Sequence, residues 1–415
     1  MTLRDDANKI IEASIQAVLP DEAVKKALSS ASFLQNRTGN IYMVSCGKAA
    51  WQMGYAASNV LGDNLHAGVV VTKYDHVKGN IPKTTCYEAG HPVPDSNSFL
   101  GTQAAIDLVS NLTKEDTVLF LISGGGSALF EKPLISEDEL ADVTKQLLAC
   151  GADITEINTI RKRLSAVKGG KFAKLCEPAQ VFSIVLSDIL GDPLDMIASG
   201  PAYPDSSTSK QAIDLVNKYQ LKLSEQALAL LEQETPKELT NVETHITGSV
   251  KNLCTAAAEC CEKLGYKPVI LTDQLDCEAR EAGKFLSSIA KSHQDTDQNL
   301  AFIAGGETIV HLTGKGKGGR NQELALAAAE GISGLGQTAV FSLGSDGTDG
   351  PTDAAGGYVD SNTKHVLAEK GIAIYDVLQN NDAYHALQKT DGLIITGATG
   401  TNVNDVAVLL IKKAE

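Results

Sequence analysis

Short apolar runs alternate with amphipathic segments along most of this chain. The apolar runs that end in glycine or polar turns begin near residues 41, 67, 84, 116 and 180. Amphipathic helices are expected at 51–62, 96–112, 136–150 and 165–176. Continuously apolar strands separated by such helices are typical of a parallel or mixed sheet covered on both faces. We therefore predict a doubly wound, Rossmann-like α/β/α domain in the N-terminal half.

A second α/β series follows two polar helices near 207–220 and 223–233. The intervening segment 233–244 is rich in charge, threonine and proline, which indicates a linker. Further strands are expected within 243–250, 267–273, 299–314, 337–347 and 391–411, with helices at 250–264, 278–292 and 322–332. These patterns predict an N-terminal Rossmann-like domain over 1–236 and a mixed α/β domain over 237–415, with the active site in the cleft that separates them.

Composition restricts the function. The 415 residues are 43% hydrophobic and carry a formal charge of −15, which argues against a nucleic-acid partner. The eight cysteines are scattered without a CxxC pair, so reduced thiols are expected. The chain shows neither a signal peptide at its first residues nor an apolar run long enough for a bilayer. We expect a cytoplasmic protein, monomeric or homodimeric, without a membrane or nucleic-acid partner.

Candidate chemistry lies at the carboxyl ends of the predicted strands, where doubly wound folds bind ligands. Lys48 follows the first strand, and could reach a phosphate or remain a solvated lysine in an ordinary turn. Another strand leads into a glycine loop whose backbone N–H groups could cradle an anion, or which could be a flexible turn. That loop consists of Ser123, Gly124, Gly125, Gly126 and Ser127.

A basic run at 158–171 stands out in this acidic chain. If it is helical, Arg161, Ser165 and Lys168 share one face, which could bind an anion or be a solvated charged surface. Asp188 and Asp192 follow the next strand and could coordinate Mg²⁺, accept a proton or cap a helix.

Glycine-rich loops recur in the C-terminal half. Glu307 lies in the first, and positions 314, 316 and 319 match the GxGxxG pattern before Arg320 and Asn321. The acid expected about 20 residues after a dinucleotide fingerprint is missing, which favours an arginine presented to a phosphate. Asp346, Asp349 and Asp353 lie on a loop that could hold a divalent cation, although its spacing is not that of an EF-hand. Asn402 lies in a polar turn near the end.

Together these loops supply what phosphoryl transfer requires, which is charge neutralisation and positioning. The chain contains no P-loop or protein-kinase motif and no metalloprotease histidine pattern. His91 is the one histidine on a plausible functional loop, and a packing role is favoured for it. The residues alone therefore indicate a phosphate-handling α/β enzyme.

At these same loops the chain resembles the second class of glycerate kinases, whose C-terminal part is called the MOFRL domain. The matching stretches are CGKAA, GHPVPDSNS, LISGGGSA, INTIRKRLSAVKGGKFA, SDILGDPLDMIASGP, GGETIVHLTGKGKGGRNQE, SDGTDGPTDAAGG and TGATGTNVND. The resemblance implies transfer of the γ-phosphoryl group of ATP to the 2-hydroxyl of D-glycerate, with Mg²⁺. By motif it implicates Lys48, Asp188, Glu307, Arg320, Asp346 and Asn402.

On this basis we expect Lys48 and Arg320, from opposite domains, to neutralise the phosphoryl group and Asp188 to accept or orient the hydroxyl proton. Residues expected to bind substrate or nucleotide are 123–127, Arg161, Lys168, Glu307, Asn321, Asp346 and Asn402. Those expected at the metal are Asp192, Asp346 and Asp349. Two alternatives stay open, because some family members were named hydroxypyruvate reductases and because a non-catalytic sensor of phosphorylated metabolites would bind the same ligands.

Overall fold

The computed structural model describes residues 2–30, 33, 38–187, 189, 191 and 193–413, which form two compact units. The N-terminal unit contains Ala23–Ser187 and a following segment that ends at Thr247. The C-terminal unit combines the first 22 residues with the chain from Gly248 onward. This differs from the continuous division predicted at residues 236 and 237, because the first helix belongs to the C-terminal unit and a strand after residue 241 belongs to the N-terminal sheet.

The N-terminal sheet has the strand order β3-β2-β1-β4-β5-β6, which is the Rossmann order. The strands are β1 (Ile41–Cys46), β2 (Leu65–Lys73), β3 (Thr84–Ala89), β4 (Thr117–Ile122), β5 (Gln180–Leu186) and β6 (Val242–Gly248). Strands β3, β2, β1, β4 and β5 run parallel to their neighbours. The predicted doubly wound fold is therefore confirmed, and the strand order reverses between β1 and β4.

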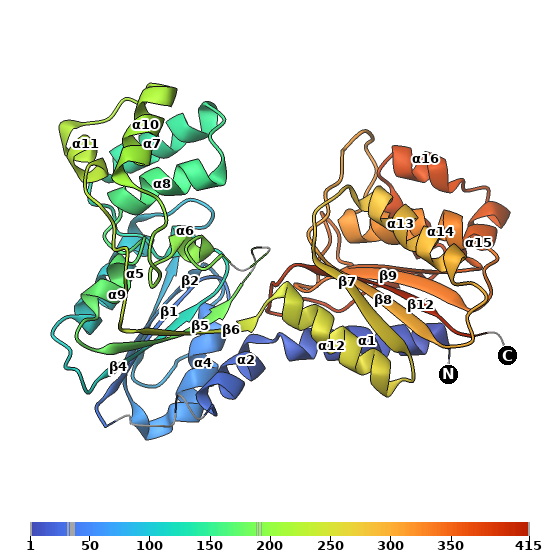
Figure 1. Ribbon diagram of the computed structural model, residues 1–415, viewed down its shortest axis with the longest axis horizontal. Coiled ribbons are helices and arrows are strands. Elements are labelled where there is room, and N and C mark those ends of the chain that lie inside the picture. Colours follow the sequence, from blue (N-terminus) through green and yellow to red (C-terminus); the bar gives the residue numbers. More distant parts are fainter. Residues whose placement is uncertain are drawn as a thin grey trace. The chain divides into compact units, whose positions relative to one another are not determined.

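Two successive residues of β2 show how helices cover both faces of this sheet (Figure 1). A Cβ placed on Gly54 of α4 (Ala50–Leu61) would lie 3.0 Å from Val70, on one face. A Cβ placed on Gly101 of α5 (Ser96–Val109) would lie 2.9 Å from Val71, on the other face. Glycine in each helix thus permits close packing on the β-branched residues of the strand.

Four helices form a separate layer with its own apolar core at the top of this unit in Figure 1. They are α7 (Glu137–Ala149), α8 (Ile154–Leu164), α10 (Ser209–Tyr219) and α11 (Glu225–Leu231). The helix predicted at 165–176 is wrong, because α8 ends at Leu164 and only α9 (Lys171–Leu175) follows. Gly169 and Gly170, at φ 59° and 82°, adopt the left-handed conformation and prevent a continuous helix.

The C-terminal sheet has the order β11-β10-β9-β12-β8-β7 and is mixed, as predicted. Only β7 and β8 are parallel among its paired strands in the described chain, and the other pairs are antiparallel. The strands are β7 (Lys267–Leu275), β8 (Leu300–Gly306), β9 (Thr338–Gly344), β10 (Gly356–Asp360), β11 (Leu393–Ile394) and β12 (Asp405–Ile411). Sequence analysis missed β10, a short strand with two glycines.

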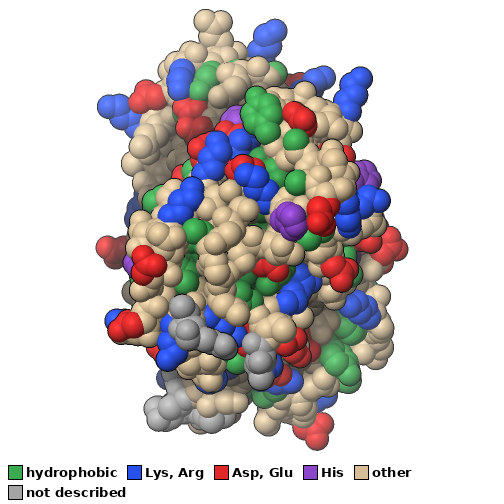
Figure 2. Space-filling view, turned by 90° about the vertical axis from the view of Figure 1, so that its right-hand side faces the viewer, with side chains coloured by type: hydrophobic (Ala, Val, Ile, Leu, Met, Phe, Trp, Pro, Cys, Tyr) green, Lys and Arg blue, Asp and Glu red, His purple; other side chains and the backbone are tan. Residues whose placement is uncertain are grey.

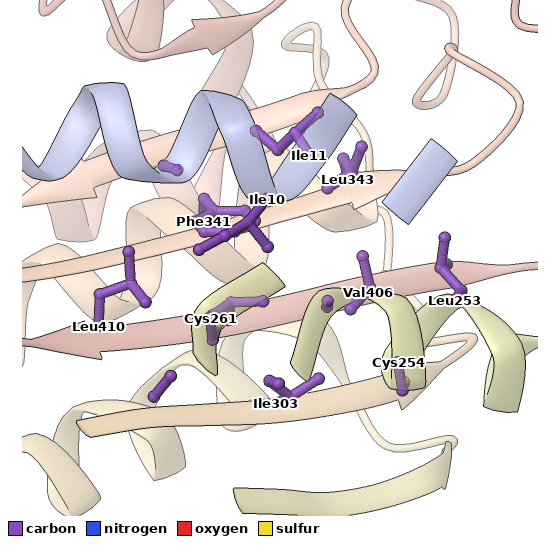
Figure 3. Packing of buried hydrophobic residues seen from close by; sticks show 14 of the residues in the cluster. Ile10, Ile11, Leu253, Cys254, Cys261, Ile303, Phe341, Leu343, Val406 and Leu410 are labelled. Atoms are coloured by element: carbon purple, nitrogen blue, oxygen red, sulfur yellow. The ribbon is translucent and has the colours of Figure 1, made fainter. Parts of the chain in front are cut away.

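The first helix, α1 (Leu3–Ala17), packs on one face of this sheet together with α12 (Val250–Lys263). Figure 3 shows Ile10 and Ile11 of α1 above Phe341 and Leu343 of β9, with Cys254 and Cys261 of α12 nearby. The opposite face is covered by α13 (Ala279–Ser292) and α14 (Arg320–Ile332). The apolar face of α1, which includes Ile10 and Ile11, is buried on this sheet, and this burial explains why α1 belongs to the C-terminal unit.

The remaining helices are short. They are α2 (Pro20–Leu28), α6 (Gly126–Leu129), α15 (Thr363–Glu369), α16 (Ile374–Gln379), α17 (Ala383–Gln388), and the 3₁₀ turns η1 (Gly62–Asn64) and η2 (Ile197–Ser199). None of the described helices has the length and apolar character that crossing a bilayer requires. On the face seen in Figure 2, acidic and basic side chains are interspersed. Anion binding therefore requires a local group of cations.

Candidate active site

Lys48 lies at the point where the strand order of the N-terminal sheet reverses. It follows β1, and its backbone N–H donates to the carbonyl of Gly124 after β4, at 2.8 Å. The hydroxyl of Ser123 accepts from the N–H of Ala49 at 3.1 Å. The turns after β1 and β4 are thus joined at the crevice where open α/β sheets bind ligands.

The glycine loop after β4 has the backbone of an anion-binding turn. Gly125 adopts φ 84°, which favours glycine, and a Cβ there would lie 3.1 Å from Cγ of Lys48. In the described chain, the N–H groups of Gly124 and Gly125 donate to no backbone carbonyl. Lys48, Ser123 and the loop therefore come together as the sequence indicated, with amide donors still available for a ligand.

Arg161 and Lys168 support this loop from behind, although α8 ends before Lys168. Arg161 donates to the carbonyl of Ser127 at 3.1 Å and Lys168 donates to the same oxygen at 2.9 Å. Both also face the buried carboxylate of Glu131, at 3.8 and 3.3 Å. The side chain of Lys168 is fully buried, so the structure gives it a loop-holding position without access to solvent.

Other cations of the basic run are engaged by groups of the protein itself. Lys162 pairs with Asp205 at 3.0 Å, and Arg163 lies 3.6 Å from the same carboxylate. Lys171 donates to three carbonyls at the end of α8, and burial lowers its pKa to about 8. Most of the run is therefore buried between elements and does not form a solvated face.

In the C-terminal unit, Arg320 begins α14 and is held by two carboxylates. Its Nε and Nη2 donate to Asp405 at 2.5 and 3.0 Å, and its Nη1 donates to Glu307 at 2.9 Å. Burial opposes the charge of Arg320, but the hydrogen bond and charge of Asp405 outweigh it and raise its pKa. Sequence analysis gave no role to Asp405, because nothing in the pattern shows that the first residue of β12 faces α14.

Asp346 and Asp349 were predicted at a metal, but they have different surroundings. Oδ1 of Asp346 accepts the N–H of Thr348 at 2.9 Å, and the residue remains partly exposed. Asp349 is buried and accepts the N–H groups of Asn321 and Gln322, at 3.1 and 2.9 Å. Asp349 thus caps α14, and the buried amide of Asn321 also contacts Asp349 and the hydroxyl of Ser342.

Asp349→Asn should change how stability depends on pH, because burial raises the pKa of Asp349 from 3.8 to about 6. A carboxyl group whose pKa is raised in the folded state stabilises the protein at pH values below its pKa in the unfolded state. This stabilisation is lost as the pH rises through the pKa of the folded state. The wild-type unfolding free energy minus that of the variant should therefore fall by about 2–3 kcal/mol between pH 4 and pH 7. Urea titrations at the two pH values measure this, and a constant difference would contradict it.

The glycine loop before α14 is held by the segment 380–382 of the same chain. The N–H groups of Thr313 and Gly314 donate to the side chain of Asn381, at 2.8 and 2.9 Å. Those of Lys315, Gly316 and Lys317 donate to Asn380 and Asp382. A Cβ on Gly314 would collide with the backbone of Asn380. These glycines therefore permit close backbone packing, and the N–H groups of 313–317 are not available as a phosphate cradle.

A cavity of about 850 Å³ opens in the C-terminal unit beside this loop. Glu307, Arg320 and Asp346 line it, together with the exposed side chain of Leu312. Such a volume with an apolar wall and a few converging charges suits a nucleotide-sized ligand. Asn402 does not line this cavity, and its side chain accepts the N–H of Asn404 at 3.4 Å.

The predicted metal ligands differ in how well their surroundings suit a metal ion. In the part of the chain that the structure describes, no three His, Cys, Asp or Glu side chains are grouped to hold a metal ion. Asp188 and Asp192 lie outside the described residues. Mg²⁺ usually needs only one or two carboxylates besides substrate phosphates, and the partly exposed Asp346 and Glu307 fit that requirement, whereas the buried Asp349 does not.

Comparison with known proteins places this arrangement in a family. Residues 6–232 match a domain of unknown function, DUF4147, and residues 300–405 match the MOFRL family. A D-glycerate 2-kinase of Thermotoga maritima is 51% identical over 99% of both chains. The chain belongs to the two-domain glycerate 2-kinase family. A glycerate 2-kinase of Pyrococcus horikoshii is 39% identical over 99% of this chain and 98% of its own.

The fold of this glycerate 2-kinase family member agrees with solved structures. A crystal structure of glycerate kinase from Thermotoga maritima superposes with a TM-score of 0.94, at 51% identity over 99% of both chains. A relative from Agrobacterium vitis, 38% identical over 90% of this chain, carries hydroxypyruvate reductase in its name. Relatives of this chain are therefore named after two different reactions, phosphorylation of glycerate and reduction of hydroxypyruvate.

Proposed function

We propose that this protein transfers the γ-phosphoryl group of ATP to the 2-hydroxyl of D-glycerate, giving 2-phosphoglycerate and ADP. The observation that carries the proposal is 51% identity, over nearly the whole chain, to a D-glycerate 2-kinase. The joined turns after β1 and β4 support it, because they offer a lysine and free amide donors at the reversal of strand order. Eight free cysteines are in keeping with a cytoplasmic location.

In the N-terminal unit, we assign Lys48 to the negative charge of the transferring phosphoryl group. The N–H groups of Gly124 and Gly125 would add hydrogen bonds to its oxygens. Arg161 and Lys168 would hold the loop in this conformation through the carbonyl of Ser127. Asp188 remains our candidate for accepting the proton of the glycerate hydroxyl.

In the C-terminal unit, we assign Arg320 to the phosphates of the nucleotide. Its bonds to Asp405 and Glu307 hold the guanidinium in one conformation, so that Arg320 loses little conformational freedom when the nucleotide binds. Asp346 and Glu307 would hold Mg²⁺ together with the nucleotide, and the ion would neutralise charge on the phosphates. The apolar wall near Leu312 would cover the base.

Two coupled measurements test the reaction. ADP release is followed with D-glycerate and ATP, and the phosphorus NMR spectrum of the product distinguishes 2-phosphoglycerate from 3-phosphoglycerate. We expect ADP formation that depends on glycerate, and a 2-phospho product. Binding of both ligands without turnover would instead indicate a sensor of metabolites.

Reduction of hydroxypyruvate is the second candidate, because a relative carries that name. The loop that matched a dinucleotide pattern has its N–H groups at 313–317 engaged by Asn380, Asn381 and Asp382. This weakens the reading of the loop as a pyrophosphate site. NADH consumption with hydroxypyruvate, in the absence of ADP formation from glycerate, would replace the kinase proposal with a reductase.

A further inference from the structure

Three cationic or titratable side chains near Lys48 were not assigned by the sequence analysis to any ligand. Lys73 ends β2, His76 lies in the turn that follows, and His91 lies just beyond β3. Lys73 pairs in register with Ala89 of β3, so the ends of β2 and β3 are adjacent. All three therefore follow parallel strands at the same edge of the sheet as Lys48.

Contacts around Lys48 and Gly125 bring these side chains together. Nδ1 of His76 lies 2.9 Å from the carbonyl of Lys48, to which it donates, leaving Nε2 free. A Cβ placed on Gly125 would lie 3.1 Å from Nε2 of His91 and 3.1 Å from Cγ of Lys48. The ring of His91 and the stem of Lys48 thus approach the glycine loop from the β1–β3 side.

The acids on these elements are engaged elsewhere or exposed. Glu88 accepts the N–H of Val77 at 2.9 Å, and Asp95 accepts the hydroxyl of Tyr74 at 2.7 Å. Asp75 is exposed in the turn. In the described chain, none of these acids forms a salt bridge with Lys48 or Lys73. Lys48 and Lys73 are therefore cations without an ion-pair partner in the described chain, and the nearby acids offset their charge only at longer range.

The electrostatics of His91 agree with this geometry. Burial lowers the pKa of His91, and Lys48, Lys73 and His76 lower it further. A bound anion would relieve this repulsion, since an opposite charge favours the protonated imidazole.

We propose that Lys73, His76 and His91 form the pocket for the carboxylate of the acceptor, a small hydroxy acid. The proposal rests on the proposed function and adds to it a residue set for acceptor binding. Lys48 and the amide donors of the glycine loop then remain available for the phosphoryl group. A carboxylate held here places the neighbouring hydroxyl carbon of the same molecule near Lys48, because the two groups are one bond apart in a 2-hydroxy acid.

The test uses Lys73→Met and His91→Gln in the full-length protein, with Lys114→Met as control. Lys114 carries the same charge but precedes β4, at the opposite edge of the sheet, with its side chain 80% exposed. Losing one charge-assisted contact should raise the KM for D-glycerate at least ~10-fold. The KM for ATP should stay within about twofold. The control should match the wild type in both constants.

Titration calorimetry with D-glycerate alone separates this inference from the reaction. If the wild type binds glycerate and both variants lose affinity at least ~10-fold, the proposed carboxylate pocket is supported even when no ADP is formed. A rise in the KM for ATP with unchanged glycerate binding would overturn the proposal and assign the cations to nucleotide phosphates. Unchanged constants for both ligands would overturn it as well.

Discussion

Lys48→Ala is expected to lower kcat by about 10²–10³-fold while the protein stays folded. The amino group of Lys48 has no hydrogen-bond or ion-pair partner in the described chain, so its removal leaves no buried partner unsatisfied. The contacts of Lys48 with Gly124 and His76 are made by its backbone and are retained in alanine. The loss should therefore appear in turnover, because the missing charge acts on the phosphoryl group in the transition state.

Steady-state kinetics and urea unfolding together measure this effect. Lys114→Ala, which removes an equally charged but exposed side chain at the other edge of the sheet, should leave both turnover and stability unchanged. Near-normal turnover in Lys48→Ala would remove the lysine from the chemistry. A large drop in unfolding free energy would mean that the residue is structural.

The proximity of the turns after β1 and β4 could be predicted from sequence because parallel strands present their carboxyl ends at one edge. That rule placed Lys48 and Ser123 together without knowledge of any contact, and the structure confirms their proximity. The sequence analysis gave no role to Lys73 or His76. The register of β2 and β3, which places the ends of the two strands side by side, is the observation that draws attention to them.

The structure differs from the expectations for the basic run at 158–171 and for the glycine loop at 313–317, and both differences have the same physical cause. A run of cations is recognised by its own charge, whereas its partners, Glu131 and Asp205, come from elements that only the folded chain brings near. Likewise, glycines suit both an anion cradle and close backbone packing. The loop at 313–317 takes the second role because the segment at 380–382 lies against it.

Arg320→Met is expected to impair both activity and stability. The guanidinium holds Asp405, whose side chain is 9% exposed, so its loss leaves a buried carboxylate unpaired. We expect the free energy of unfolding to fall by about 2–3 kcal/mol and kcat to fall by about 10²–10³-fold. Burial already raises the pKa of Asp405 against the effect of Arg320, so this carboxylate should take up a proton more readily in the variant.

The double variant Arg320→Met/Asp405→Asn separates the two effects. Asp405→Asn removes the unpaired buried charge that Arg320→Met leaves behind, so a substantial part of the unfolding free energy should return. Turnover should not return, because no cation remains beside Glu307 to bind phosphate. Recovery of kcat along with stability would show that Arg320 only balances the charge of Asp405, whereas a lasting loss of turnover in a stable protein identifies the guanidinium as part of the phosphate-binding machinery.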